Sequence, residues 1–185
     1  TTIVFNPTWN IPESIITNEI AGFMQNDPNY LSKNSIGIYT NWENTSQKIE
    51  PTEINWEEIK NQGTDLRFTQ TAGSHNVLGK VKFIFKNPHD VYLHDTKNKS
   101  LFNTNTRTYS HGCIRVEDPL LLAQYLLENY RKGELNAFEE TGDNKKTKYI
   151  NLSKKIPIHI TYITSWVDQY GITHFRKNIY NKKIY

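Results

Sequence analysis

The sequence is poor in cysteine and has no long apolar runs. Cys113 is the only cysteine among 185 residues, which excludes an internal disulfide and any metal site built from several cysteines. No apolar run reaches the ~18 residues that a membrane-spanning helix needs. The sequence shows no signal peptide and begins with threonine rather than methionine, so we expect a mature or trimmed piece of a longer protein.

Positive charge is unevenly distributed along the chain. Residues 1–60 carry three Lys or Arg against eight Asp or Glu, whereas residues 61–185 carry nineteen against eleven. A basic body attracts anionic polymers such as nucleic acids. The sequence contains no zinc-finger, helix-turn-helix or RNP pattern, however, so we interpret the excess as solvated surface and expect no nucleic-acid partner.

Hydrophobic periodicity predicts a mainly β protein with two helices, in the α+β class. The predicted elements are, in chain order, a helix from Pro12, strands over residues 79–85 and 91–95, a helix capped by Asp118 that begins at Pro119, a strand over residues 156–164, and a hairpin that turns at Asp168–Gly171. Residues 28–63 are acidic and rich in turn formers, and we expect them to be irregular. Their aromatic residues either pack a small core of their own or line a binding surface.

The surroundings of Cys113 suit a nucleophile, although a lone cysteine is usually a small buried hydrophobe. Gly112 permits unusual backbone angles and a close substrate approach. The N–H groups around Gly112 and Cys113 could form an oxyanion hole. Arg115, two residues along a strand, shares a face with Cys113 and suits a substrate carboxylate. These features alone leave both interpretations open.

Either of two histidines could act as the base. His111 lies in the same loop as Cys113, whereas His94 lies on a separate predicted strand, whose alternation puts Tyr92 and His94 on one face. Asp95 could orient the His94 ring through its side chain or its carbonyl. A zinc site of His94, His111 and Cys113 is an alternative, but it lacks a fourth ligand at a familiar spacing.

The motif around Cys113 resembles the signature of a known family. His94, fifteen intervening residues and then the hexapeptide SHGCIR (residues 110–115) resemble the motif of the YkuD-type L,D-transpeptidases. Further segments match, in order, the large periplasmic Gram-negative members that carry an inserted capping subdomain: PTWNIPESI, NDPNYL, LRFTQTAGSHNVLGKVKF, VYLHDT, RTYSHGCIRVEDP and FRKNIY. The resemblance therefore covers nearly the whole chain.

The resemblance implies a fold and a reaction. The fold would be one YkuD-like β-sandwich or barrel catalytic domain over residues 1–185, with a helix after the cysteine and with residues 13–65 as a capping or lid subdomain. Cys113 would attack the carbonyl before the terminal D-Ala of a peptidoglycan tetrapeptide stem, and a second stem would resolve the thioester into a 3→3 cross-link. The implied partners are donor and acceptor stems and carbapenem inhibitors. The implied location is the periplasm, and no metal or organic cofactor is implied.

The resemblance also assigns roles to individual residues. His94 carries over as the general base, oriented at Asp95 by a backbone carbonyl, and Gly112 with Cys113 as oxyanion-hole positions. Substrate-binding positions would be Arg115, His111, Ser110, Tyr109 and Arg107. Among these, Ser110 is expected mainly to hold the loop by hydrogen bonds, and Arg107 and Tyr109 either line the cleft or brace the loop. We expect structural or surface roles for His75, His89, His159, His174 and Trp166.

The chain departs from the family pattern at its beginning, and the sequence does not identify the acceptor of the acyl group. Only TTIVFN precedes PTWN in this chain, whereas the long family members have further strands there. With water as acceptor, the same site would be an L,D-carboxypeptidase, and with a protein as acceptor it would attach that protein to the wall. A sortase-like transpeptidase and a non-catalytic cell-wall-binding module are two further functions that the sequence leaves open.

Overall fold

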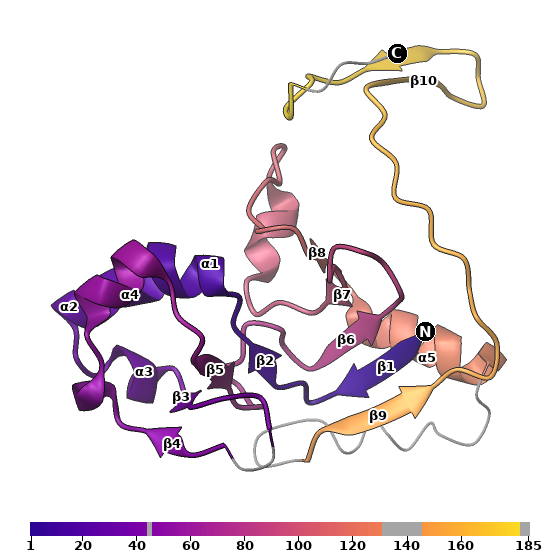
Figure 1. The fold of residues 1–185 in the computed structure, drawn as a ribbon. Helices are drawn as coiled ribbons and strands as arrows, with labels where there is room; N and C mark the ends of the chain where they lie inside the picture. Colours follow the sequence, from indigo (N-terminus) through magenta and orange to yellow (C-terminus); the bar gives the residue numbers. More distant parts are fainter. Residues whose placement is uncertain (44–45, 131–145, 182–185) are drawn as a thin grey trace. The chain divides into compact units, whose positions relative to one another are not determined.

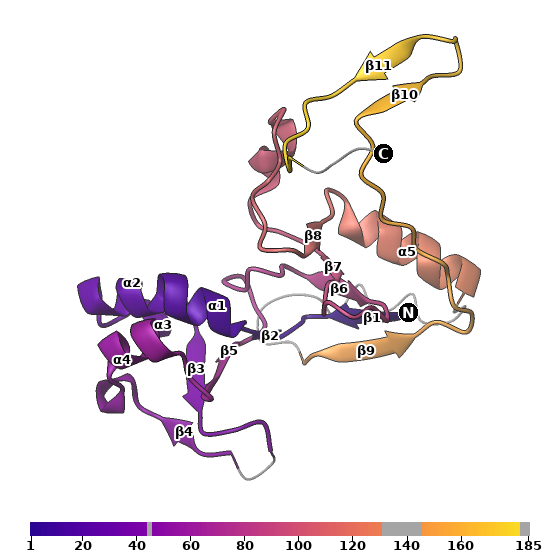
Figure 2. The same ribbon diagram turned by 45° about the horizontal axis from the view of Figure 1, so that its top comes forward.

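The computed structural model describes residues 1–43, 46–130 and 146–181. The chain divides into two compact units, residues 1–155 and residues 156–185. The described residues contain strands in three sheets and several helices (Figures 1 and 2), so the predicted mainly β, α+β class is confirmed. The prediction of a single domain over residues 1–185 stays a prediction. No helix in the described part of the chain is long and apolar enough to cross a membrane.

The larger sheet of the first unit has five strands, and β6 is the central one. Its order is β8-β7-β6-β1-β9, and its strands are β1 (Thr2–Phe5), β6 (Val81–Ile84), β7 (Leu93–His94), β8 (Ile114–Arg115) and β9 (Lys148–Asn151). The β7–β8 pair is parallel, and the other three pairs are antiparallel. Strands β7 and β8 therefore form one end of the sheet.

Helix α5 (Pro119–Tyr130) packs on β6 (Figure 2). It begins at Pro119 as predicted, because proline needs no partner for its missing N–H at the first helical position. The buried apolar side chains of this helix and the sheet form the core; they are Ile3, Val4, Phe5, Val81, Phe83, Ala123, Leu126, Leu127 and Ile150. Burial of each large side chain contributes about 1.5–3 kcal/mol, so this core fixes the strands that carry the site.

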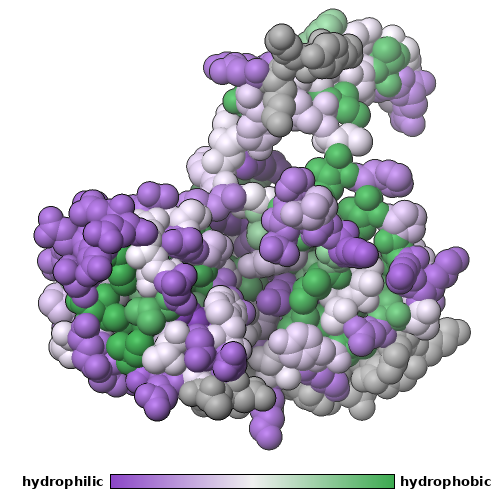
Figure 3. Space-filling view, viewed as in Figure 1, coloured by the Kyte–Doolittle hydropathy of each residue, from purple (hydrophilic) through white to green (hydrophobic). Residues whose placement is uncertain are grey.

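A second sheet of the first unit has the order β2-β5-β3-β4. Its strands are β2 (Trp9–Asn10), β3 (Ile36–Tyr39), β4 (Lys48–Ile49) and β5 (Arg67–Gln70). The helices beside it are α1 (Glu13–Ile15), the π-helical η1 (Ile16–Ile20), α2 (Ala21–Asn26), α3 (Tyr30–Lys33), the 3-10 helix η2 (Pro51–Glu53) and α4 (Trp56–Gln62). Hydrophilic side chains gather over the outer helices in Figure 3.

Two expectations for this region need correction. The helix predicted from Pro12 forms, but Pro12 is its N-terminal cap rather than its first residue. Residues 28–63 are not irregular, because the described part of this range contains two helices and two strands besides the 3-10 helix η2. The region has its own core, in which Ile38, Ile59 and Phe68 are buried, and the Trp56 ring meets Phe68 edge-on at 6.1 Å. Packing of a small core therefore accounts for this aromatic residue.

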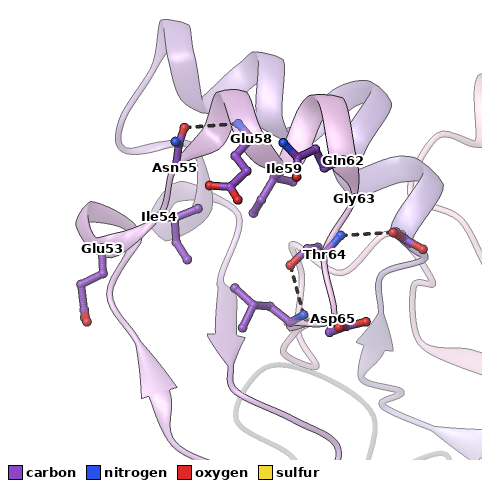
Figure 4. Close-up of a pocket in the computed structure, with 11 residues that line it drawn as sticks. Glu53, Ile54, Asn55, Glu58, Ile59, Gln62, Gly63, Thr64 and Asp65 are labelled. Atoms are coloured by element: carbon purple, nitrogen blue, oxygen red, sulfur yellow. Dashed lines mark hydrogen bonds between the residues drawn. The ribbon is translucent and has the colours of Figure 1, made fainter.

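The two ends of the segment 13–65 are joined to each other. The Glu13 carboxylate accepts the Thr64 N–H at 3.1 Å, and both residues line a cavity of about 380 Å³ (Figure 4). Acidic side chains of Glu53, Glu58 and Asp65 line it as well, but no cysteine or histidine does. Closely spaced ends are expected of an insertion into another domain. A capping function for residues 13–65 stays a prediction.

Two buried amide side chains organise the return from the small sheet to the large one. Gln70 donates to the carbonyls of Asn34 and His75, both at 2.9 Å. Asn76 donates to the Pro7 carbonyl at 2.9 Å and accepts the Leu78 N–H at 2.8 Å. Buried backbone polar groups need such partners, so these amides fix the loop that leads into β6.

The second unit contains the hairpin of β10 (Ser165–Val167) and β11 (Thr173–Phe175). It turns at residues 168–171 as predicted, with Gly171 N–H donating to Asp168 O at 3.1 Å. The strand predicted over residues 156–164 is wrong, because these residues form no regular strand. Alternation of apolar residues reports a preference for one-sided burial, whereas a strand also needs a partner backbone with which to form its hydrogen bonds.

Candidate active site

The parallel pair β7–β8 brings the two motif segments together. Leu93 lies opposite Ile114 and His94 opposite Arg115, so Cys113, which directly precedes β8, lies beside β7. The Ile114 N–H donates to the Tyr92 carbonyl at 3.1 Å, and the Val116 N–H donates to the His94 carbonyl at 2.8 Å. Residues that are far apart in the sequence therefore become neighbours across a sheet.

The His94 ring is held in one tautomer. Its Nδ1 lies 2.5 Å from the Asp95 carbonyl oxygen, and because a carbonyl can only accept, we assign the ring proton to Nδ1. The neutral ring then carries its lone pair on Nε2. Burial lowers the pKa of His94 below its ordinary value, while the hydrogen bond to Asp95 acts in the opposite direction. His94 is 6% exposed, so this shift favours the neutral form that a base requires.

Asp95 acts on His94 through its carbonyl, and its carboxylate fixes that backbone. The carboxylate accepts the N–H groups of Lys80 at 2.8 Å and Thr96 at 2.7 Å, and it pairs with Lys99 at 2.7 Å. The sequence left open whether Asp95 orients the His94 ring through its side chain or through its carbonyl. In the structure, the carbonyl contacts the ring.

Gly79 is required beside this carboxylate. Its φ is +62°, and a Cβ at this position would lie 2.3 Å from Asp95 Oδ2. We expect Gly79→Ala to destabilise the fold by about 1–3 kcal/mol because it combines backbone strain with this clash. Urea unfolding measures the change, with Gly22→Ala as the control, since a Cβ at Gly22 meets nothing within 4 Å. Equal stability of the parent and Gly79→Ala would contradict the placement of Asp95.

The loop before β8 is braced by Ser110. Its hydroxyl donates to the Cys113 carbonyl at 2.5 Å and accepts the Gly112 N–H at 3.2 Å. Gly112 adopts φ +140°, which glycine tolerates. The Gly112 N–H, one of the oxyanion-hole positions expected from the sequence, is therefore engaged within the loop. Ser110 therefore has the loop-holding hydrogen bonds expected from the sequence.

Tyr92 and Lys82, near His94, received no role from the sequence. The Tyr92 ring meets the His94 ring edge-on at 5.8 Å, and the Lys82 ammonium lies 5.2 Å from the Tyr92 ring centre. Burial raises the pKa of Tyr92, and the charge and hydrogen bonding of the neighbouring Cys113 raise it further. Burial lowers the pKa of Lys82. Strand alternation put Tyr92 on the His94 face, but only the register pairs Lys82 with His94.

Most of the predicted site residues line one cavity of about 450 Å³. Its lining includes Tyr92 together with the predicted residues His94, Ser110, His111, Gly112, Cys113 and Arg115. Helix η1 contributes Glu19, which pairs with His111 at 2.7 Å and links the segment 13–65 to the cysteine loop. The cavity lining does not include Arg107, Tyr109 or Asp95. Arg107 donates to the Thr104 carbonyl at 2.9 Å, so it braces its own loop.

The zinc alternative finds no support in the described part of the chain. No cluster of three or more His, Cys, Asp or Glu side chains there could hold a metal ion. Cys113 is a free thiol of intermediate exposure. An accessible sulfur, a neutral imidazole and backbone donors in one cavity are the components of nucleophilic acyl transfer.

Comparison with known proteins agrees with this chemistry. The YkuD family, described as the L,D-transpeptidase catalytic domain, matches residues 1–158. The chain is also similar to a Haemophilus influenzae protein named "Putative L,D-transpeptidase", with 34% identity over 177 residues. That match covers 93% of this chain but 34% of the relative, so the chain spans about a third of the relative's length.

Proposed function

We propose that this chain, which belongs to the YkuD family of L,D-transpeptidase catalytic domains, forms 3→3 cross-links in peptidoglycan through a thioester on Cys113. The observation that carries the proposal is the shared cavity of Cys113 and His94, in which the Asp95 carbonyl leaves Nε2 of His94 as the basic nitrogen. The family membership supplies the substrate class, the stem peptides of the cell wall.

The first half-reaction would load the enzyme with a donor stem. Nε2 of His94 takes the Cys113 thiol proton, and the sulfur attacks the carbonyl between the third and fourth residues of the tetrapeptide. Negative charge develops on that carbonyl oxygen, where the Cys113 N–H and the Tyr92 hydroxyl are suitable donors. His94 then returns the proton to the departing nitrogen of D-Ala. The bond to D-Ala breaks, and a thioester between Cys113 and the tripeptide remains.

The second half-reaction would pass the acyl group to an amine. The side-chain amine of a diamino acid in a second stem attacks the thioester, and His94 accepts a proton from it before returning one to the leaving sulfur. Arg115 lies opposite His94 on β8 and lines the cavity, so its guanidinium is suitably placed to bind a stem carboxylate. His111 and Glu19 would contact substrate at the side of the segment 13–65. Such substrates lie in the periplasm, where we propose that the site works.

Product analysis tests the proposal. The chain is incubated with purified disaccharide-tetrapeptide, and the products are identified by mass spectrometry. We expect a 3→3 cross-linked dimer and one released D-Ala for each bond formed. A disaccharide-tripeptide without dimer would instead establish the L,D-carboxypeptidase alternative. Unchanged substrate, together with no adduct on Cys113 after incubation with a carbapenem, would contradict an acyl transferase of this class.

Tyr92→Phe tests the proposed oxyanion donor. Removing one such donor costs about 100- to 1,000-fold in rate, and because the Cys113 N–H remains, we expect the rate of acylation to fall by about 100-fold. Stopped-flow measurement of carbapenem acylation provides the rate. Tyr109→Phe is the matched control, since Tyr109 is 46% exposed and does not line the cavity. Equal rates for the two variants would remove Tyr92 from the mechanism.

A further inference from the structure

Lys99 connects the chain segments that follow the two strands of the site. It is the first residue of the 3-10 helix η3 (Lys99–Asn103). Its ammonium lies 2.7 Å from Asp95 Oδ1, 2.6 Å from the Glu117 carbonyl and 3.4 Å from the Val116 carbonyl. Asp95 directly follows β7, whereas Val116 and Glu117 directly follow β8. One side chain therefore binds the C-terminal ends of both strands.

The strand pair depends on such a link because it is short. Strands β7 and β8 have two residues each, and β8 ends the strand order of the sheet. Backbone hydrogen bonds from Ile114 to Tyr92 and from Val116 to His94 run across the pair at its two ends. The ammonium of Lys99 adds further contacts beyond the end where this ladder stops. These contacts link the strand that carries His94 to the strand that Cys113 precedes.

The same side chain also stabilises the group that orients the base. Asp95 is 7% exposed, and a buried carboxylate needs a counter-charge as well as hydrogen-bond donors. The N–H groups of Lys80 and Thr96 are its backbone donors, and Lys99 is its cation. Movement of Asp95 would move its carbonyl, and with it the hydrogen bond that holds His94 Nδ1.

We propose that Lys99 is a positioning residue of the acyl-transfer site: its bridge from Asp95 to the Val116 and Glu117 carbonyls holds His94 at the distance from Cys113 that proton transfer requires. The inference rests on the proposed function. Lys99 itself does not line the cavity, so it acts through the backbone of the two strands rather than on the substrate.

Three variants separate positioning from simple charge neutralisation. Lys99→Met removes the ammonium and keeps most of the length of the side chain. We expect kcat to fall about 10- to 100-fold with little change in KM, since misplacement by about 1 Å has effects of this size. Lys99→Arg should recover part of the loss. The double variant Lys99→Met/Asp95→Asn removes the unpaired buried charge and restores stability, yet kcat should stay low because the bridge is absent.

The controls keep the test decisive. Lys86→Met removes an exposed lysine outside this network and should match the parent. Thermal unfolding reports whether each variant is folded. Recovery of kcat in the double variant, or unchanged kcat in folded Lys99→Met, would overturn the proposal.

A substrate-free measurement distinguishes this inference from the proposed function. The alkylation rate of Cys113 by iodoacetamide is followed against pH. We expect the alkylation rate to fall in both Lys99→Met and the double variant, because His94 no longer lies where it can accept the thiol proton. Parent-like rates for both would reject the role of Lys99, even if the chain formed no cross-links with muropeptides. Slower alkylation in both variants would retain it, even if the parent formed no cross-links.

Discussion

Cys113→Ser is expected to lower the rate of acyl transfer by at least about 1,000-fold, because loss of the nucleophile in enzymes of this kind removes nearly all of the catalysed rate. A serine hydroxyl is similar in size to the thiol, but it ionises far less readily and needs a stronger base. Since Cys113 is only partly buried, the fold should tolerate the change. Intact-mass spectrometry after incubation with a carbapenem should show an adduct on the parent and none on the variant.

Ser110→Ala is the informative companion to that experiment. Ser110 carries the other hydroxyl of the motif, and it is engaged with the Cys113 carbonyl and the Gly112 N–H. This variant should still form the adduct, although more slowly, because the loop loses a brace rather than its nucleophile. An adduct that persisted in Cys113→Ser and disappeared in Ser110→Ala would exchange the assigned roles of the two residues.

His94→Ala is expected to reduce kcat by about 100- to 10,000-fold, the usual contribution of a positioned general base. The plot of kcat against pH for the parent should also show a fall on the acid side. Burial lowers the pKa of His94, so Nε2 stays unprotonated to a pH below the ordinary value of about 6.5. Activity should therefore be retained at that pH and lost only as the pH falls further. The plot of kcat against pH for His94→Ala should lack this fall.

The stability of the fold, like the activity, should fall as the pH falls. The folded state holds His94 with a lowered pKa, so the unfolded chain binds more protons in the interval between the two pKa values. The contribution of His94 to stability is then complete above the ordinary pKa value and is lost as the pH falls through the folded pKa.

His89→Ala is the matched control for the kcat of His94→Ala, since His89 lines the same cavity without an assigned role. An equal loss of kcat in His89→Ala would contradict the choice of base.

The sequence predicted the site better than the arrangement that produces it. The residues around Cys113 left its role open, and the resemblance of its motif to a known family favoured a nucleophile; strand alternation put His94 and Tyr92 on one face. The strand predicted over residues 91–95 contains β7, but its parallel pairing with β8 was not predicted, because pairing joins segments distant in the sequence and local periodicity does not report it. The contacts of Lys82 and Lys99 depend on strand register and on where a loop returns, which local patterns do not contain. Both lysines would count as surface charge from the sequence alone.

The errors in the fold have a related origin. Composition made residues 28–63 resemble a loop, yet burial of Ile38 and Ile59 supports strands and helices there. The alternation over residues 156–164 resembled a strand, yet no ladder forms there. A turn, by contrast, is determined by neighbouring residues, and the hairpin at Asp168–Gly171 was predicted correctly.

The position of β1 between β6 and β9 has a consequence for the order in which the chain assembles during synthesis. Strand β1 leaves the ribosome before either neighbour, yet Phe5 pairs with Val81 on one side and with Lys148 on the other. The strands β6, β7 and β8 are close in sequence, so their loop-closure entropy is small, and the pair that carries His94 and Cys113 can form early. The edge of β1 that pairs with β9 stays unpaired until β9 has been synthesised. Until that strand emerges, the nascent protein exposes an apolar edge to wrong partners, which makes closure by β9 the vulnerable step of its biogenesis.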